Sequence, residues 1–227
     1  GEDMRGKSIA CAGLGNVTWG ICKRALQRGA KGVARWGPHG EIYDEECGKR
    51  NFKTAQLLLT ADDLRSRKRY LNVMNCINAL WENGVLPIVN ENDPVSVDEL
   101  KFGDNDTLAG MLASLTDSQL TIILTTEQGL RERVDGVLGD RISVVESLDE
   151  TVKAMAGDTD NSEFSIGGMS SKLRAAEIVT AAGEYLWIAD GRVKGILNSI
   201  LNGEDVGTVF LPRRHRLKHV LGGDNGH

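Results

Sequence analysis

Short apolar runs alternate along this chain with segments whose apolar residues follow a helical spacing. The runs at 120–124 (LTIIL) and 185–189 (YLWIA) have the length and composition of buried strands. Because a parallel connection must cross one face of the sheet, such alternation predicts a largely parallel sheet with helices on both faces. The other expected elements are helices at 65–83, 168–182 and 193–201, and short strands that end at 59, 89 and 210.

Three expected helices carry an apolar face, with residues spaced by three or four positions: those at 65–83 and 168–182, and a further one that includes Leu108 to Leu115. The three faces consist of Val73, Ile77, Leu80 and Trp81; of Leu108, Met111, Leu112 and Leu115; and of Ala175, Ile178, Val179 and Ala182.

One residue bears on the order of the strands. Proline cannot donate to a strand ladder, so Pro87 argues against a central place for the strand that ends at 89.

Composition narrows the class of protein. The 227 residues are enough for one large α/β domain, and the net charge of −5 gives no reason to expect nucleic acid as a partner. No run reaches the ~18 apolar residues of a membrane helix, and the amino terminus has no signal-peptide pattern. The four cysteines lack C-x-x-C spacing, so neither a zinc site nor a disulfide framework is expected. We therefore expect a cytoplasmic protein with a basic, flexible tail at 213–227.

Two polar motifs stand where helices are expected to begin. In Gly103–Leu108 (GDNDTL), Asp104 is the expected N-cap and Asp106 lies one turn inside the helix. In Ser165–Lys172 (SIGGMSSK), a glycine pair precedes a helix that carries a lysine in its first turns. Backbone N–H groups and a lysine at a helix start favour phosphate binding, and a carboxylate–amide cluster favours a polar substrate or Mg²⁺. The two motifs together predict phosphoryl transfer.

Each candidate residue has a structural alternative. Lys172 can compensate charge on a transferred phosphoryl group, or it can be an exposed lysine paired with Glu177. Asp106 can orient Lys172 or approach Mg²⁺, or it can simply interact with the helix dipole. Asn105 and Asp93 can bind the ammonium or carboxylate of an amino acid, although the proline after Asp93 also favours a turn.

Polar residues also follow the ends of two expected strands. They are Asn90–Asp93 (NEND) and Thr125–Glu127 (TTE), and ligands of parallel sheets bind beyond the carboxyl ends of the strands. The first fifty residues are less informative. The glycines between 13 and 20 depart from the G-x-G-x-x-G spacing, and no convincing strand precedes them, so a turn or helix end is expected there.

Four motifs occur in a fixed order: NEND at 90–93, GDND at 103–106, GGMSSK at 167–172 and NGEDVGT at 202–208. From about Ala55 to Pro212 the chain resembles the glutamate 5-kinases of the amino acid kinase superfamily. The resemblance implies a three-layer αβα sandwich around a largely parallel sheet, in a homo-oligomer (dimer or tetramer). It also implies that ATP, with Mg²⁺, phosphorylates the γ-carboxylate of L-glutamate, which is the first step of proline biosynthesis.

The same resemblance assigns roles to individual residues. Lys172 matches a lysine that contacts the transferred phosphoryl group, and Asp106 matches the aspartate that organises the catalytic lysines. Because a γ-carboxylate is already ionised at neutral pH, the reaction needs no general base. The substrate-binding positions are Asn90, Asp93 and Asn105, and the nucleotide-binding positions are Thr125, Thr126, Gly167, Gly168, Met169, Ser170, Ser171 and Lys172.

The chain departs from the family pattern at its amino-terminal side. The Lys-x-Gly-Thr strand and the Ser-Ser-Gly-Ala turn are absent, nothing in 17–50 aligns with the family, and Thr126 replaces a nucleotide-site aspartate. We expect one kinase-like domain over 1–212, whose segment 1–52 is divergent or truncated. Two alternatives follow: a kinase for acetylglutamate, aspartate or a nucleoside monophosphate, or an inactive relative that binds nucleotide or amino acid.

Overall fold

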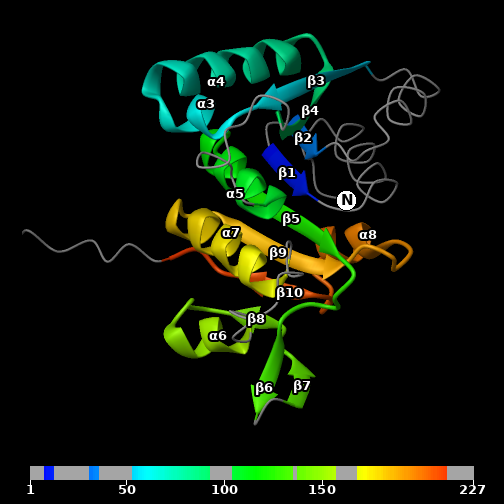
Figure 1. The fold of residues 1–227 in the computed structure, drawn as a ribbon. Coiled ribbons are helices and arrows are strands. Elements are labelled where there is room, and N and C mark those ends of the chain that lie inside the picture. The colour runs from blue at the N-terminus through cyan, green and yellow to red at the C-terminus, as the bar shows by residue number, and fades with distance from the viewer. Residues whose placement is uncertain are drawn as a thin grey trace, which may run out of the picture.

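The computed structural model describes residues 8–12, 31–35, 53–92, 104–134, 137–156 and 168–213. Their main feature is an eight-stranded sheet of order β3-β4-β2-β1-β5-β9-β10-β8, in which only the β9–β10 pair is antiparallel. Its strands are β1 (Ser8–Ala12), β2 (Lys31–Arg35), β3 (Lys53–Leu59), β4 (Val85–Glu91), β5 (Leu120–Thr125), β8 (Val144–Val145), β9 (Tyr185–Asp190) and β10 (Thr208–Phe210). The largely parallel sheet expected from the sequence is confirmed (Figure 1).

Helices cover both faces of this sheet. Ile123 of β5 packs in one core cluster with α7, whereas its neighbours Ile122 and Leu124 pack in another with α8. Successive strand residues point to opposite faces, so α7 and α8 lie on opposite sides. This is the three-layer sandwich predicted from the sequence. The described helices are α3 (Ala61–Arg65), α4 (Arg67–Glu82), α5 (Asn105–Leu115), α6 (Glu150–Met155), α7 (Met169–Ala181) and α8 (Ile196–Leu201).

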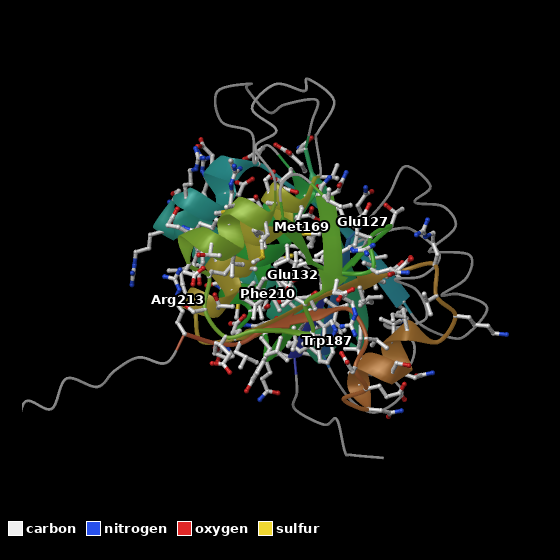
Figure 2. The ribbon with its side chains drawn as sticks, turned by 90° about the horizontal axis from the view of Figure 1, so that it is seen from below. Glu127, Glu132, Met169, Trp187, Phe210 and Arg213 are labelled. Carbon is white, nitrogen blue, oxygen red and sulfur yellow. The ribbon has the colours of Figure 1, made fainter. Side chains whose placement is uncertain are left out.

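The core is largest beneath α7. Phe210 is fully buried there, and Met169 packs against the same cluster. Figure 2 places Arg213 away from this interior, where the described chain ends. Arg213 is the described residue of the expected basic tail, and its backbone N–H donates to the carbonyl of Thr180 (2.9 Å). A third cluster joins α3, α4 and α5 to β3 and β4 around the fully buried Ile77.

Two strands lie where the sequence pattern indicated none. β1 occupies the middle of the sheet, with β2 on one side and β5 on the other, although no convincing strand was expected near residue 10. β2 also lies within the first fifty residues, where no strand was expected. Small or charged side chains give weak strand propensity, but pairing on both sides overrides local preference. The expectation for both segments was therefore wrong.

Pro87 also lies in an interior strand, contrary to expectation. β4 pairs with β3 along 85–91, and its ladder with β2 begins only at Ile88, which pairs with Ala34. Pro87 thus precedes the part of β4 that is paired on both sides, where its missing N–H would matter most.

The apolar faces are mostly confirmed. Ile77, Leu108, Leu112 and Leu115 are buried as predicted. In α7, Ala175 and Val179 are buried, but Ile178 is only half-buried and Ala182 is exposed. The buried face is rotated towards Leu173 and Ala176 because α7 packs against α5 as well as the sheet. The helix expected from residue 193 begins at Ile196, since Gly195 has a φ of +83°.

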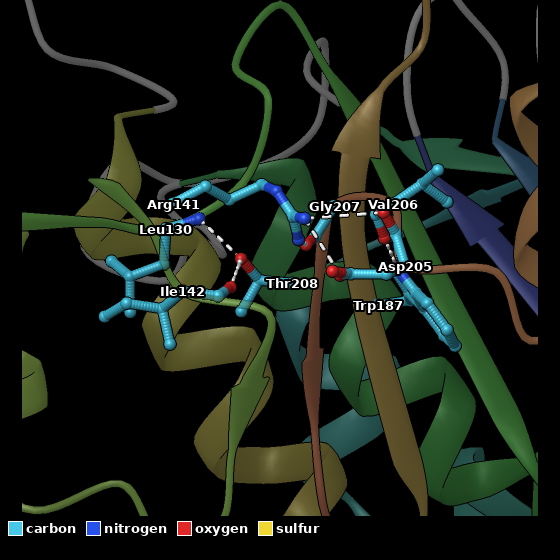
Figure 3. Close-up of polar contacts among 8 residues, drawn as sticks. All are labelled: Leu130, Arg141, Ile142, Trp187, Asp205, Val206, Gly207 and Thr208. Atoms are coloured by element: carbon cyan, nitrogen blue, oxygen red, sulfur yellow. Dashed lines mark hydrogen bonds and ion pairs between the residues drawn. The ribbon is translucent and has the colours of Figure 1, made fainter.

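A hairpin of β6 (Arg131–Val134) and β7 (Val137–Arg141) is anchored to the sheet by Thr208. Thr208 Oγ1 accepts from the N–H of Leu130 (2.8 Å) and donates to the carbonyl of Ile142 (2.6 Å), as Figure 3 shows. Leu130 precedes β6 and Ile142 follows β7, so the two hydrogen bonds of this hydroxyl satisfy backbone groups on both sides of the hairpin and fix its base.

The loop that carries the NGEDVGT motif contacts the same hairpin. Arg141 binds the carboxylate of Asp205 (2.8 Å) and the carbonyl of Gly207, and Trp187 Nε1 donates to the carbonyl of Val206 (2.6 Å; Figure 3). Gly207 has a φ of +65°, and a Cβ there would collide with the carbonyl of Ile188. These contacts attach the motif to β7 and β9.

Candidate active site

Lys172 and Asp106 form a buried ion pair between α7 and α5. Lys172 Nζ lies 3.0 Å from Asp106 Oδ2, and the two side chains are 7% and 15% exposed. The alternative partner, Glu177, instead contacts Lys153 (3.5 Å) and Arg213 (3.1 Å). The sequence-based pairing of Lys172 with Asp106 is therefore confirmed, and the pairing with Glu177 is wrong.

Ser171 completes the connection around Asp106. Its Oγ lies 2.9 Å from Asp106 Oδ2 and 2.8 Å from the carbonyl of Gly168, so its single O–H can be donated to either oxygen. Lys172 and Ser171 thus both lie within hydrogen-bonding distance of one carboxylate oxygen of Asp106, which holds the start of α7 against the start of α5.

The two helix starts are capped differently. Asp104 is the N-cap of α5, and its carboxylate accepts from the N–H of Thr107 (2.6 Å), as the sequence predicted. Gly168 is the N-cap of α7, and no described side chain caps that helix. The N–H groups of the first turn of α7 are thus suited to an anionic ligand, because the helix dipole also favours negative charge there.

Close packing keeps the two helices in register. Asp106 pairs with Lys172 near the helix starts, and Gly110 lies against Ala175 further along. Residue numbers in the contacts thus rise together in α5 and α7, so the two helices are parallel. A Cβ on Gly110 would lie 3.1 Å from the carbonyl oxygen of Ala175 and 3.2 Å from its Cα. A parallel helix pair at this short separation brings both N-termini together.

Helix and strand lengths place these groups at the carboxyl edge of the sheet. α5 has 11 residues and α7 has 13, and each leads through a short turn into a strand of six residues, β5 or β9. At 1.5 Å per helical and about 3.3 Å per strand residue, all four elements are roughly 16–20 Å long. The starts of both helices therefore lie level with the ends of both strands.

Thr125 and Thr126 mark the end of β5. Thr125 is buried, and its carbonyl accepts from the N–H of Gly191 (2.8 Å). Thr126 is exposed, and its carbonyl accepts from Arg192 Nη2 (2.6 Å). Both candidate nucleotide residues are thus tied to the chain that follows β9.

Asp190 and Arg192 lie at the end of β9, and sequence reasoning assigned them no role. Arg192 Nε and Nη2 lie 2.9 and 2.8 Å from the two carboxylate oxygens of Asp190. These hydrogen bonds from Arg192 hold the pKa of Asp190 below its usual value, and Asp190 raises the pKa of Arg192. An acid at the end of an apolar strand, with an arginine two residues later, was the available signal.

The candidate amino-acid residues are partly described. Asn90 lies near the end of β4, and its Oδ1 is buried with no hydrogen-bond partner among the described residues. A buried acceptor of this kind suits a substrate ammonium group. Asn105 is the first residue of α5 and is half-buried. Asp93 and Gly167 lie outside the described residues, as does the segment 13–20.

No group of three or more histidine, cysteine, aspartate or glutamate side chains capable of holding a metal occurs among the described residues. A Mg²⁺ ion that binds together with nucleotide phosphates typically needs only one or two protein carboxylates and so does not require such a group. In the described part of the chain, no helix is long and apolar enough to span a bilayer.

Comparison with known proteins identifies the family. Residues 40–190 match the family model described as the amino acid kinase family. The chain belongs to the amino acid kinase family. It is 44% identical to glutamate 5-kinase of Desulfotalea psychrophila over 178 residues, which cover 78% of this chain and 47% of that protein. It is 42% identical to glutamate 5-kinase of Anaeromyxobacter dehalogenans over 234 residues, covering 97% of this chain and 61% of that protein.

These matches confirm the resemblance and correct its extent. The expected start near Ala55 was too late, because the family match begins at residue 40 and one relative aligns with 97% of the chain, including most of 17–50. Short motifs do not reveal weak sequence similarity that is distributed over a long segment. The chain spans about half the length of the curated relatives it matches, between 47% and 51% for the first five.

A structural neighbour supports the fold independently. Carbamate kinase from Giardia lamblia, solved with AMP-PNP bound, superimposes with a TM-score of 0.64 at 16% identity, covering 92% of this chain and 99% of that chain. At this identity the likeness shows a shared αβα fold.

Proposed function

We propose that this chain phosphorylates the γ-carboxylate of L-glutamate with ATP, giving γ-glutamyl phosphate in proline biosynthesis. The buried Lys172–Asp106 pair beside the start of α7 is the observation that carries the proposal. A lysine ammonium held at 7% exposure next to the N–H groups of a helix start is suited to charge that develops on a phosphoryl group. The relatives named glutamate 5-kinase support the choice of acceptor.

In this proposal each residue of the site has a separate role. Lys172 compensates charge on the transferring group, and the first-turn N–H groups of α7 bind phosphate oxygens. Asp106 fixes the position of the Lys172 ammonium, which lowers the reorganisation needed during transfer. Asn90 and Asn105, with Asp93, bind the amino acid, and Thr125 and Thr126 contribute to nucleotide binding.

ATP as donor is supported by the AMP-PNP complex of the structural neighbour. Mg²⁺, when bound with the nucleotide, would neutralise charge on the phosphates, and Asp106 is the described carboxylate that would approach it. The cytoplasmic location, the homo-oligomer and the division into a domain over 1–212 and a tail belong to the same proposal.

The reaction is tested by incubating the protein with ATP, Mg²⁺, glutamate and hydroxylamine, which traps an acyl phosphate as its hydroxamate. We expect glutamate hydroxamate. Hydroxamate from aspartate or acetylglutamate alone, or phosphorylation of a nucleoside monophosphate, would replace the substrate assignment. Absence of product from every acceptor would contradict the kinase proposal, and nucleotide binding without turnover would favour an inactive binding relative.

Lys172→Ala should lower kcat and kcat/KM together by about 10²-fold or more, because its interaction forms in the transition state. Lys172→Arg should not restore activity fully, since a planar guanidinium does not replace a compact ammonium. Lys153→Ala is the matched control: Lys153 is a helical lysine that is 39% exposed and pairs with Glu150 and Glu177. Equal kinetics in the Lys172→Ala and Lys153→Ala variants would remove Lys172 from the site.

A further inference from the structure

Arg192 is a second cation at the carboxyl edge of the sheet, and the roles above do not use it. Its side chain is 63% exposed, whereas the Asp190 carboxylate that holds it is only 10% exposed. A mostly buried anion therefore positions a guanidinium that solvent, or a ligand, can reach.

The contacts of Arg192 leave donors available. Nε binds one oxygen of Asp190, and Nη2 binds the other oxygen and the carbonyl of Thr126. A guanidinium has five N–H groups, so these contacts use three. Within the described residues, both N–H groups of Nη1 have no partner. The backbone N–H of Arg192 also donates to Asp190 Oδ1 (2.9 Å), which fixes the turn that carries the side chain.

This arrangement suits phosphate oxygens. A guanidinium held by two parallel hydrogen bonds has already lost rotamer freedom, so a ligand need not order it again. A planar, permanently charged donor also matches phosphate geometry. Because Nη2 and Nε are occupied, an anion would bind at Nη1.

The position of Arg192 fits a nucleotide that reaches across the strand ends. Arg192 follows β9, whose end lies beside that of β5 and level with the start of α7. Lys172 is already bound to Asp106 between the helices, on one face of the sheet. Arg192 and Lys172 thus both lie at the carboxyl edge of the sheet, each bound to its own aspartate.

We propose that Arg192, positioned by Asp190, binds a second phosphate of the nucleotide and not the transferred one that Lys172 serves. This inference rests on the proposed function, because it takes the carboxyl edge to be the nucleotide site. Arg192 would then contribute to nucleotide affinity and to ATP KM, while Lys172 contributes to turnover.

The test measures dissociation constants of ADP and adenosine, by calorimetry or by competition, for the wild-type protein and five variants, of which Lys172→Ala is one. Arg192→Gln should weaken ADP binding about tenfold or more and leave adenosine binding unchanged. Arg192→Lys and Asp190→Asn should give intermediate losses of ADP affinity, because each variant keeps a positive charge at position 192 but loses the paired hydrogen bonds between residues 190 and 192. Arg213→Gln is the control: Arg213 is also exposed and bound to a carboxylate, but it lies beside Thr180 at the far end of α7.

Equal losses for ADP and adenosine would show that Arg192 only supports the fold of the turn, and an unchanged ADP affinity would remove it from the site. Should Arg192→Gln fail to fold, the Arg192→Lys and Asp190→Asn variants decide by the same ratio. If Lys172→Ala weakens ADP binding but the Arg192 variants do not, this inference alone fails. If the wild-type protein binds no ADP, the proposed function fails with it.

Discussion

At the scale of single residues, the Lys172–Asp106 pair separates stability from activity. Removing one partner leaves the other as a buried charge, so Lys172→Met and Asp106→Asn should each lower the free energy of unfolding by about 3–5 kcal/mol. The double variant removes both charges and should recover at least half of that loss. All three variants should lose hydroxamate formation, because none retains a positioned ammonium.

Chemical denaturation of the four proteins gives the coupling free energy, and the hydroxamate assay is run on the same samples. If the double variant loses as much free energy of unfolding as the two single variants together, this result would contradict a buried pair of Lys172 and Asp106. Activity that returns together with stability in the double variant would contradict a catalytic role for Lys172.

At the scale of elements, the separation of α5 and α7 depends on Gly110. Alanine normally stabilises a helix interior by about 1 kcal/mol relative to glycine. Here the added Cβ would meet the backbone of α7 at 3.1–3.2 Å, which a side chain cannot relieve by rotating. We expect Gly110→Ala to lower stability by about 1–3 kcal/mol, as overpacking does, and to lower kcat by shifting Asp106 relative to Lys172.

Ser114→Ala is the matched control, since Ser114 lies in the same helix and is exposed. It introduces the same residue at a position that does not face α7, so helix propensity should raise stability by about 0.5 kcal/mol or less and leave kcat unchanged. Both variants are measured by thermal denaturation and by turnover. A gain in stability from Gly110→Ala would show that α7 can move away and that the close approach is unnecessary.

At the scale of the whole molecule, the sheet separates the candidate site from a buried carboxyl at its opposite edge. Glu184 precedes β9 and is 6% exposed, and its Oε2 has no partner among the described residues. Burial, together with the nearby Asp117, raises the pKa of Glu184 from 4.5 to about 8. The folded state therefore favours the protonated form.

The sign of the pH effect follows from this raised pKa. The stabilisation from Glu184 is complete below pH 4.5 and is lost as pH rises through about 8. Glu184→Gln stays neutral, so its stability relative to wild type should rise between pH 5 and pH 8.5, by an amount on the order of a few kcal/mol. Asp190 and Asp205, whose pKa values are lowered by Arg192 and Arg141, act in the opposite direction and cancel in this difference.

Denaturation of wild type and Glu184→Gln at both pH values measures the effect, with Glu82→Gln, on the exposed surface of α4, as control. A difference that does not change with pH would contradict the raised pKa. Because Glu184 lies at the edge away from the candidate site, Glu184→Gln should leave ATP and glutamate KM unchanged. A changed KM would show that the two edges of the sheet are coupled.

The sequence by itself determined the elements whose signals are local. The apolar run of β5, the N-cap at Asp104 and the glycine start of α7 depend on residues within a few positions of one another, and the structure has each of them. The order of the polar motifs likewise predicted the family, because each motif is a short, contiguous string.

Only the tertiary structure decided what depends on distant pairing. β1 and β2 have weak local signals and exist as strands because neighbouring strands complete their ladders. The contact of Asp106 with Lys172 joins residues 66 positions apart, and it required the close packing that Gly110 permits. The fork between Asp190 and Arg192 spans two residues, but its place at the candidate site follows from the sheet order. Hydrophobic spacing specifies which face of an element is buried, whereas the choice of neighbour is made only when distant segments pack together.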